Sequence, residues 1–429
     1  MLNLNKSKNM MSEKRQFLFE ATHYAEPILC SGNGTKVTDI DGNEYLDLNA
    51  GQFCLIFGHN YQPFEAVVKQ QLKKIYHTNT GTLTPEVLRA AEDMASINSG
   101  DLSKTIFLST GSEANECALR FAKAFSHKNG VLGFDKGYHG LTLGSQGNTM
   151  GGQWAMPLVP LTFSTRTPDL FHKEEKYSDA DYLQLCIEDL ENNFMQHKDQ
   201  LAAVIMEPIV GVGGMIPIPY EYLMRVRQLC DEYQVVLIFD ECQCGFGRTG
   251  DWYAYQKIGV IPDVVTSAKA MGMGMAVSSV TFSKRIADKV EFGLTHFSSH
   301  QNDPISSSIV SFVINEIREK NLLEKNKLTG KTLLSTIQEA CSNSDGVLVN
   351  ARGVGLMCAF DINDQVIHDY RKASALFSNM MQENGVLIQA VRQGRTFRIM
   401  PNYFITDEEI EQLGKAMKIS ANGLRMSIK

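Results

Sequence analysis

The stretch that decides the fold reads Val235-Val-Leu-Ile-Phe-Asp240-Glu-Cys-Gln243. Its apolar residues have the length and composition of a buried strand, and an acidic residue follows them directly. In parallel α/β sheets, ligands bind at the carboxyl ends of the strands, which is where Asp240 would lie. An aspartate in such a position often only caps a loop, so other segments must support a functional site here.

Similar short apolar runs alternate with helical patterns along the middle of the chain. They cover residues 105–109, 131–134, 203–206 and 264–267. Thr84 and Pro85 indicate the start of a helix over residues 85–97. This alternation predicts an α/β fold with a largely parallel sheet and helices on both of its faces.

The two ends of the chain have a different pattern. Residues 36–48 predict a short antiparallel meander that turns at Asp41-Gly42-Asn43. Short strands are also expected at residues 355–361 and 397–400, followed by a last helix. Thr406 and Glu409 form the capping box of that helix.

These patterns divide the chain into three segments. Residues 61–305 are expected to form a large domain. Residues 1–60 and 306–429 are expected to form a small domain built from both ends of the chain. No internal repeat or low-complexity linker interrupts this division.

The composition of the 429 residues is that of an ordinary globular protein, with 43% hydrophobic and 21% charged residues. The net charge of −7, without a long basic run, argues against nucleic acid and anionic membranes as partners, and a small molecule fits better. The 9 cysteines are scattered, contain no CxxC pair and are expected to be reduced. Without an apolar leader or a membrane-spanning segment, a cytoplasmic protein is expected.

A lysine follows the next apolar run after Asp240. The residues after Lys269 are Ala-Met-Gly rather than solvated polar residues, so this lysine is expected to be partly desolvated. Burial lowers the pKa of an amine and frees the lone pair that a Schiff base needs. A single lysine after a strand is usually a surface residue, but its pairing with Asp240 favours a functional role.

Thr110, Gly111 and Ser112 form a third informative segment, where an apolar run passes into a helix through a Gly-Ser turn. Gly111 would let the backbone approach an anion, and Ser112 would donate its hydroxyl. The start of the helix would add free N–H groups and a favourable dipole. The pattern predicts a phosphate site, although a serine at a helix start is usually only a cap.

In their order and spacing, these motifs resemble those of the class III aminotransferases, a branch of the fold type I pyridoxal 5′-phosphate (PLP) enzymes. The match extends over nearly the whole chain. The resemblance implies a mostly parallel seven-stranded sheet in the large domain, a small α+β domain, and PLP as the cofactor.

The resemblance also assigns roles to single residues. Lys269 would form the Schiff base with PLP, Asp240 would pair with its pyridinium nitrogen, and Gln243 would contact its ring hydroxyl oxygen. Asp240 would hold the ring protonated, so that the ring withdraws electrons, and Lys269 would move protons at the substrate. The other residues assigned to the cofactor are Thr110, Gly111, Ser112, Tyr138, His139 and Glu207, together with Ser299, which would reach the cofactor of a neighbouring subunit.

Branches of this family differ at the position five residues after Glu207. Branches that act on ω-amines, such as the ornithine and 4-aminobutyrate aminotransferases, carry a glutamate there, which masks the arginine that binds the substrate carboxylate. This chain has Val212 at that position. Arg398 matches the arginine and would stand unmasked, ready for a bidentate carboxylate pair. An α-amino acid and a 2-oxo acid follow as the expected substrates.

Within the family, the resemblance is closest to the 2,2-dialkylglycine decarboxylases, which are decarboxylating aminotransferases. It rests on Ala50-Gly51-Gln52, on residues 298–304 and on Val212. The branch implies that Gln52 holds the substrate carboxylate so that carbon dioxide leaves. Gln52 could equally satisfy only the backbone of its loop. Tyr138, where that branch has tryptophan, and Phe53-Cys54-Leu55 depart from the pattern and leave the substrate open.

The same branch binds an alkali metal ion. The residues that match its ligands are Thr78, Thr80, Ser299, Gln301 and Asp303. Their oxygen atoms suit a hard cation. Asp303 could instead be only the N-cap of a helix that begins at Pro304.

Together, these observations predict a homodimer, or a dimer of dimers, that transaminates α-amino acids. The donor would lose carbon dioxide, and its amino group would pass to a 2-oxo acid. Transamination without decarboxylation is the first alternative, and an amino-acid racemase or epimerase on the same scaffold is the second. A non-catalytic ligand sensor is a further alternative, but such proteins usually add a DNA-binding module, and none is expected here.

Overall fold

The computed structural model describes residues 2–22, 24, 26–150, 159–290, 296–367 and 369–427 of the chain. The chain splits into two compact units. Unit 1 holds residues 1–62, 331–351 and 358–429, and unit 2 holds residues 63–330 and 352–357. The sequence places the end of the large domain at residue 305, whereas unit 2 continues to residue 330. Helix α10 (Pro304–Glu319) packs against α4 (Pro85–Ile97) within this unit, which accounts for the longer span.

Unit 2 is built on a seven-stranded sheet whose strands lie in the order β4-β12-β11-β10-β7-β5-β6. Its strands are β4 (Leu102–Leu108), β5 (Gly130–Phe134), β6 (Thr162–Thr165), β7 (Leu201–Met206), β10 (Val236–Asp240), β11 (Val264–Ser267) and β12 (Ser278–Ser283). Strand β12 is antiparallel to both of its neighbours, and all other neighbouring strands are parallel. The predicted α/β fold with a mostly parallel sheet is confirmed, and each apolar run in the middle of the chain overlaps one of these strands.

Helix α5 (Gly111–Ser126) covers one face of this sheet. Ala114, Ala118 and Phe121 of α5 belong to one hydrophobic cluster with Ile205 of β7 and Ile238 of β10. The alanines keep the helix close to the strands, and burial of each larger side chain contributes about 1.5–3 kcal/mol. This packing fixes the start of α5 near the edge of the sheet where the parallel strands end.

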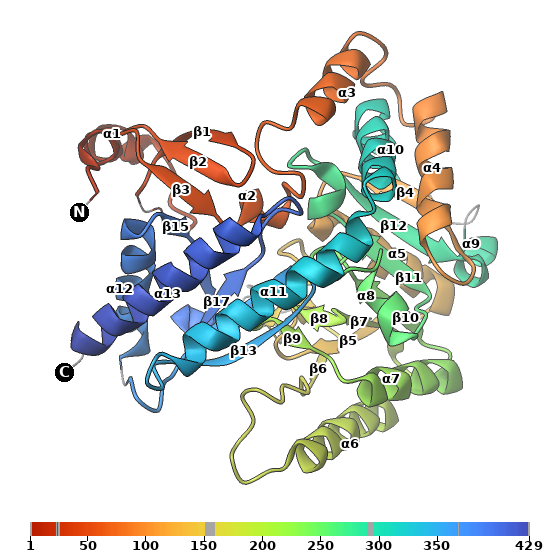
Figure 1. Ribbon diagram of the computed structural model, residues 1–429. Coiled ribbons are helices and arrows are strands. Elements are labelled where there is room, and N and C mark those ends of the chain that lie inside the picture. Colours follow the sequence, from red (N-terminus) through yellow and green to blue (C-terminus); the bar gives the residue numbers. More distant parts are fainter. Residues whose placement is uncertain are drawn as a thin grey trace. The chain divides into compact units, whose positions relative to one another are not determined.

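The remaining helices of unit 2 surround the sheet (Figure 1). They are α3 (Gln62–Leu72), α4, α6 (Asp179–His197), α7 (Tyr220–Tyr233), α8 (Ala254–Ile258), α9 (Lys284–Val290) and α10, and α11 (Leu322–Ser342) begins in this unit. Helices α6 and α7 pack side by side. A small hairpin of β8 (Ile209–Val210) and β9 (Ile216–Pro217) follows β7.

Unit 1 combines the two ends of the chain, which are red and blue in Figure 1. One sheet has the order β1-β2-β3-β15 and a second has the order β13-β14-β17-β16. The strands are β1 (Leu29–Asn33), β2 (Lys36–Asp39), β3 (Glu44–Asp47), β13 (Leu348–Val354), β14 (Met357–Ile362), β15 (Val386–Leu387), β16 (Gln389–Val391) and β17 (Thr396–Ile399). Strand β15 from the C-terminal part pairs with β3 from the N-terminal part, so both ends share one sheet.

The helices of unit 1 include the expected last helix. They are α1 (Asn5–Lys14), α2 (Ala50–Phe53), α12 (Tyr370–Glu383) and α13 (Asp407–Ser427). The capping box of α13 is confirmed, because Thr406 N donates to Glu409 Oε2 at 3.0 Å and Glu409 N donates to Thr406 Oγ1 at 3.3 Å.

Two further expectations concern the whole chain. All nine cysteines are free thiols, as expected for a reduced protein. In the parts of the chain that the structure describes, no helix has both the length and the apolar character needed to cross a membrane.

Candidate active site

Three chemically important side chains come from the carboxyl ends of three adjacent parallel strands. Asp240 ends β10, Glu207 follows β7, and Lys269 follows β11 closely. Strand β10 lies between β7 and β11 and pairs with both in parallel. The residues that the sequence assigns to a ligand site at this edge of the sheet therefore lie there in the structure.

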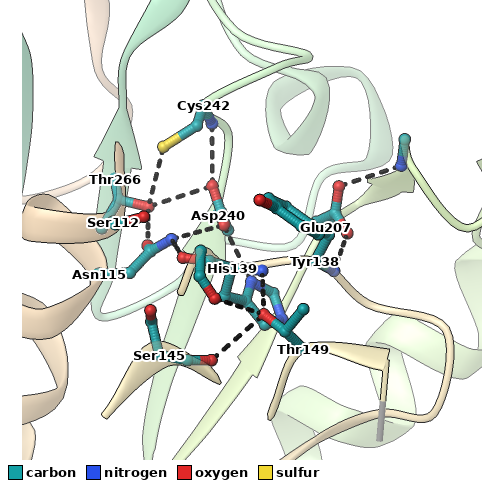
Figure 2. Close-up of polar contacts among 12 residues, drawn as sticks. Ser112, Asn115, Tyr138, His139, Ser145, Thr149, Glu207, Asp240, Cys242 and Thr266 are labelled. Carbon is teal, nitrogen blue, oxygen red and sulfur yellow. Dashed lines mark hydrogen bonds and ion pairs between the residues drawn. The ribbon is translucent and has the colours of Figure 1, made fainter. Parts of the chain in front are cut away.

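Asp240 is held by hydrogen bonds on both of its carboxylate oxygens (Figure 2). Asn115 Nδ2 lies 2.7 Å from Oδ2, and His139 Nδ1 lies 2.9 Å from the same atom. The backbone N–H of Cys242 donates to Oδ1 at 3.0 Å, and the hydroxyl of Thr266 lies 3.4 Å from Oδ1. With a side chain only 4% exposed, this carboxylate is fixed in one orientation.

The surroundings keep Asp240 ionised. Burial opposes ionisation, but the hydrogen bond and the charge of His139, followed by the contact with Cys242 and the charge of Lys269, lower the pKa of Asp240 to about 2. The carboxylate is therefore negative at neutral pH. Such a group can hold a proton on a ring nitrogen of a bound ligand by charge attraction and hydrogen bonding.

Sequence reasoning missed Asn115, Thr149 and Thr266, which position this carboxylate and its histidine. Thr266 donates to Asn115 Oδ1 at 2.7 Å, and Asn115 Nδ2 also reaches His139 O at 2.9 Å. Thr149 Oγ1 accepts from the backbone N–H of His139 at 3.0 Å. Strand register could have indicated Thr266, because it lies opposite Asp240 in the β10–β11 pair. Helix spacing could have indicated Asn115, because it lies one turn after Gly111.

Glu207 joins two loops at the same edge of the sheet. Its Oε1 accepts from the backbone N–H of Tyr138 at 2.9 Å, and its Oε2 accepts from Gly211 N at 3.0 Å. Burial, together with the charge of Asp240, raises the pKa of Glu207 to about 7 despite these hydrogen bonds. This carboxylate therefore links the loop that carries Tyr138 to the β8–β9 hairpin.

Gln243 presents a polar atom that the described part of the chain leaves unsatisfied. Its side chain is 8% exposed, and its buried Oε1 has no hydrogen-bond partner among the described residues. A Cβ at Gly211 would lie 1.6 Å from this Oε1, so no other residue fits at position 211 without moving Gln243. This buried amide oxygen is therefore available to accept a hydrogen bond from a ligand or from water.

The start of α5 has the features expected of a phosphate site. Thr110 caps the helix by accepting from Glu113 N, which leaves the N–H groups of Gly111 and Ser112 without an intrahelical acceptor. Gly140 has a φ of +110°, and a Cβ there would lie 2.0 Å from Ser112 Oγ. The glycine thus allows its loop to lie directly against Ser112.

Lys269 occupies a strained backbone position. It is the first residue of a short 3₁₀ helix, η4 (Lys269–Gly272), with a φ of +47°. A residue with a side chain rarely adopts this conformation, and such strain is concentrated at functional sites. The residue is half-buried, and its charge lowers the pKa of Asp240, so the two groups lie within electrostatic range.

These groups fit the cofactor that the sequence resemblance implies. PLP has an anionic phosphate, a ring nitrogen that must stay protonated, a ring hydroxyl oxygen and an aldehyde. The start of α5, the ionised Asp240, the amide of Gln243 and the amine of Lys269 are suited to these four features in turn. Ser299, the remaining residue assigned to the cofactor, is exposed in a single chain.

Gln52, in unit 1, lies on a turn with unusual backbone angles. The φ values of Ala50, Gly51, Gln52 and Phe53 are 42°, 56°, 61° and 70°, so four successive residues are left-handed. The side chain of Gln52 is exposed. Each such residue with a side chain costs roughly 1–2 kcal/mol. The sequence gives little sign of this turn, since Gly51 is the only residue in it that favours the conformation.

Arg398, also in unit 1, does not stand unmasked as the sequence resemblance implies. Its Nη2 donates to Oε1 of Gln389, which lies opposite Arg398 in the β16–β17 pair. The ring of Phe53 lies 4.5 Å from the guanidinium carbon, and Arg398 is only 3% exposed. Residue 212 is indeed an uncharged valine, but the antiparallel pairing brings a glutamine to the arginine instead.

The residues expected to bind an alkali ion lie in unit 2. Thr80 Oγ1 donates to the backbone oxygen of Ser298 at 3.0 Å, and the buried Oε1 of Gln301 has no partner among the described residues. Both oxygens of Asp303, however, pair with imidazoles, those of His77 and His300. The present arrangement fits an alkali ion poorly, because its only carboxylate is already paired.

Comparisons with known proteins identify the family of the chain. The profile of the family described as aminotransferase class-III matches residues 21–419. An uncharacterized aminotransferase of Schizosaccharomyces pombe is 31% identical over 426 residues, which cover 95% of this chain and 92% of that protein. An acetylornithine aminotransferase of Methanopyrus kandleri is 31% identical over 399 residues, which cover 93% of this chain and 94% of that protein.

Solved structures share the same fold over almost their full length. A transaminase obtained by directed evolution through ancestral reconstruction has a TM-score of 0.91 at 22% identity, with 100% of both chains covered. An ω-transaminase of Pseudomonas jessenii in complex with PMP has a TM-score of 0.90 at 21% identity, with 98% of both chains covered. These likenesses show the fold, whereas the profile and the relatives show the family. The chain belongs to the class III aminotransferases.

Proposed function

We propose that this class III aminotransferase is a PLP-dependent enzyme of α-amino acids that releases carbon dioxide from the donor and passes its amino group to a 2-oxo acid. Class III aminotransferases use PLP and act on amino and oxo acids. The proposal adds the α-carboxylate, the decarboxylation and the assignment of single residues. The observation that carries it is the ionised Asp240 beside Lys269 at the carboxyl ends of the strands.

PLP, when bound, withdraws electrons from the α-carbon of the substrate. Asp240 would keep the ring nitrogen protonated, and Asn115 and His139 hold the carboxylate in place for this task. Lys269 would hold the cofactor covalently between turnovers, and its amine, once released, would move a proton at the substrate. Glu207 would keep the Tyr138 loop in place.

An α-carboxylate on the substrate is supported by the residue at position 212. Val212 carries no charge, whereas the ω-amine branches of the resemblance have a glutamate there. Arg398 would bind the carboxylate through its fork of N–H donors. Its contact with Gln389 is a hydrogen bond to a neutral amide, and a carboxylate competes well against such a partner because it adds charge attraction.

Decarboxylation is supported by the left-handed turn that exposes Gln52. An amide can donate hydrogen bonds to a carboxylate and orient it without adding the charge that would stabilise it against leaving. The backbone strain of residues 50–53 indicates that the position of this amide matters more than the local stability of the turn.

The test is a screen of α-amino and 2,2-disubstituted amino acids in which pyridoxamine phosphate and trapped carbon dioxide are measured in parallel. We expect both to appear with a suitable donor. Gln52→Ala should lower carbon dioxide release by about 10²-fold, the scale of one lost donor at a reacting centre, and transamination of an ordinary L-amino acid should fall less. Equal losses in both reactions would return Gln52 to a structural role in its loop.

Transamination without decarboxylation is the second candidate. The Methanopyrus kandleri relative, 31% identical, is named an acetylornithine aminotransferase. Amino transfer from a donor of that kind with no carbon dioxide from any donor would establish this candidate. Loss of optical activity of a single enantiomer in the absence of an oxo acid would instead indicate racemase or epimerase activity.

We further propose that the active enzyme is at least a homodimer. The resemblance has Ser299 act on the cofactor of a second subunit, and the side chain is exposed in a single chain. Sedimentation at micromolar concentration should give a dimer or larger species, and a fully active monomer would contradict it. An alkali ion is left out of the proposal, because both oxygens of Asp303 are paired with imidazoles.

A further inference from the structure

Two histidines from distant segments of unit 2 meet at one carboxylate. Nδ1 of His77 lies 2.7 Å from Oδ1 of Asp303, and Nδ1 of His300 lies 2.6 Å from Oδ2. The two imidazole centroids are 5.0 Å apart, and the possible ligand atoms of the three residues all lie within 4.8 Å of one another. Two nitrogen donors and one oxygen donor therefore converge on a small volume.

The carboxylate in this cluster does not perform the task that its chain position predicts. Asp303 is the N-cap residue of α10, yet its side chain accepts no hydrogen bond from the start of the helix. It is only 4% exposed, and both of its oxygens face imidazole nitrogens instead. This buried carboxylate thus faces two side chains of a type that can bind a metal ion.

We propose that His77, His300 and Asp303 form a binding site for a divalent first-row transition ion of the Zn²⁺ type. Imidazole nitrogens together with a carboxylate are a donor set that Zn²⁺ and Co²⁺ accept readily, whereas alkali and alkaline-earth ions prefer oxygen donors alone. In a single chain the side chains of His77 and His300 are 45% and 64% exposed, which leaves room for water or another ligand to complete the coordination. The site has three protein ligands and an open position.

Only small movements are needed to place an ion among these atoms. Bonds of about 2.0–2.1 Å put neighbouring ligand atoms of a tetrahedral site roughly 3.3 Å apart. The present N–O separations of 2.7 Å and 2.6 Å, each to a different oxygen of Asp303, would widen by less than 1 Å. The longer separations between ligand atoms, which reach at most 4.8 Å, would close by up to about 1.5 Å. Both histidines lie outside helices and strands, where side-chain rotation can provide this change. Each imidazole would bind the ion through the lone pair of Nδ1 and carry its proton on Nε2.

The ion would strengthen a link that the chain already makes. Thr80 Oγ1 donates to the backbone oxygen of Ser298 at 3.0 Å, so the segments that carry His77 and His300 are joined at a second point. The bound ion would hold the segment that includes Ser299 against residues 77–80. This inference does not rest on the proposed reaction, because it concerns binding of an ion by residues outside the Asp240 network.

The experiment uses tag-free holoenzyme that has been freed of metals on a chelating resin. Calorimetric titration with Zn²⁺ should give one ion per chain, with an increase in the melting temperature. Titration with Co²⁺ should give the intense visible d–d absorption of a four- or five-coordinate ion while the cofactor absorption stays unchanged. His77→Ala and His300→Ala should each weaken Zn²⁺ binding at least tenfold.

The matched control is His172→Ala. His172 pairs with Asp169 at 2.7 Å in the same way, but the other charged partner of that carboxylate is Lys136, also at 2.7 Å, rather than a second imidazole. This variant should bind Zn²⁺ like the parent protein. If His300→Ala fails to fold, His300→Gln keeps a polar side chain of similar size and gives the same test.

Three results would overturn the proposal. The parent protein could fail to bind Zn²⁺ and Co²⁺, it could bind K⁺ in their place, or His77→Ala and His300→Ala could bind Zn²⁺ as tightly as His172→Ala does. Each measurement is independent of turnover, so an enzyme that transaminates normally can still refute the metal site.

Discussion

The Asp240 network and the turn at residues 50–53 position their side chains by opposite means. Asp240 ends a regular strand, is 4% exposed and accepts hydrogen bonds on both oxygens. Gln52 is exposed on four successive left-handed residues, and the ring of the next residue, Phe53, lies against Arg398. One region obtains its geometry from regular structure and the other from strained backbone.

This difference matches the two tasks of a transaminase. The ring nitrogen of the cofactor has to stay protonated throughout the reaction, so a fixed and fully hydrogen-bonded carboxylate serves it best. Donor and acceptor differ, so the groups that meet them must release one and take the other. Arg398 has a neutral amide, Gln389, as one of its partners, and in the proposed reaction a substrate carboxylate would replace it. The following predictions test this contrast.

The largest effect is expected at Lys269. Lys269→Ala should abolish turnover and the visible absorption band of the lysine-bound cofactor, because Lys269 is the lysine that follows the β11 strand beside Asp240. Cofactor held only by its phosphate would remain measurable by fluorescence. A normal absorption band in the variant would show that another lysine holds the cofactor and that the strand-edge site is wrong.

Asp240→Asn should reduce kcat/KM by about 10³-fold, because an asparagine cannot hold the ring nitrogen in its protonated state. Steady-state kinetics, with cofactor content checked by absorbance, measure this. Thr266→Val is the matched variant, since it removes an uncharged hydroxyl that donates to Asn115, contacts Cys242 Sγ and lies 3.4 Å from the carboxylate. It should cost no more than about tenfold. If kcat/KM fell by a similar factor in both variants, the negative charge of Asp240 would have no special role in the reaction.

The sequence was enough to predict one of these regions but not the other. Asp240, Lys269 and the Gly111–Ser112 turn could be predicted because apolar runs define parallel strands, and parallel strands end at a common edge. Asn115 and Thr266 were not predicted, because their contacts join residues 125 and 26 positions from Asp240 and depend on helix spacing and strand register. Likewise, the contact between Gln389 and Arg398 depends on antiparallel register, which composition does not reveal.

The two buried glutamates at the strand edge should make stability depend on pH. Burial raises the pKa of Glu241 from 4.5 to about 7, although Ala254 N and Tyr255 N donate to it. A carboxyl group whose pKa is higher in the folded state than in the unfolded state stabilises the folded state while it is protonated. This contribution is complete below pH 4.5 and is lost as the pH rises to about 7. The expected loss is a few kcal/mol for each such group, Glu207 included.

Glu241→Gln isolates this contribution. The variant loses one hydrogen bond at every pH, so its melting temperature should be lower than that of the parent protein by a constant amount. The fall of the melting temperature between pH 5 and pH 8 should be less steep in the variant than in the parent protein. Glu221→Gln, on the exposed first turn of α7, is the control and should keep the parent slope. Parallel curves for the parent protein and Glu241→Gln would mean that Glu241 is ionised throughout this range.

A smaller effect is expected at Gln389. Gln389→Glu would give Arg398 a charged partner at the same place, so a substrate carboxylate would have to displace an ion pair. The KM for a 2-oxo acid should rise about tenfold while kcat changes little. Gln382→Glu adds the same charge on α12 and should leave KM unchanged. A similar KM in Gln389→Glu and the parent would show that Gln389 does not govern access to Arg398.

The smallest effect concerns the strain at Gln52 itself. A glycine at position 52 adopts the observed φ of 61° without the steric cost of a side chain, but it loses more chain entropy on folding. The balance should stabilise Gln52→Gly by about 0.5–1 kcal/mol, whereas Gln52→Ala keeps the strained Cβ and should gain nothing. Calorimetry would measure this difference as a melting temperature higher by about 1–2 °C in the glycine variant.

Both variants lack the amide, so both should lose carbon dioxide release to the same extent. A glycine variant that is more stable but releases less carbon dioxide would indicate that the turn keeps its strain in order to position the glutamine. A glycine variant that is more stable and fully active would show instead that the side chain at position 52 has no part in the reaction, and the contrast between the two regions would then rest on Arg398 alone.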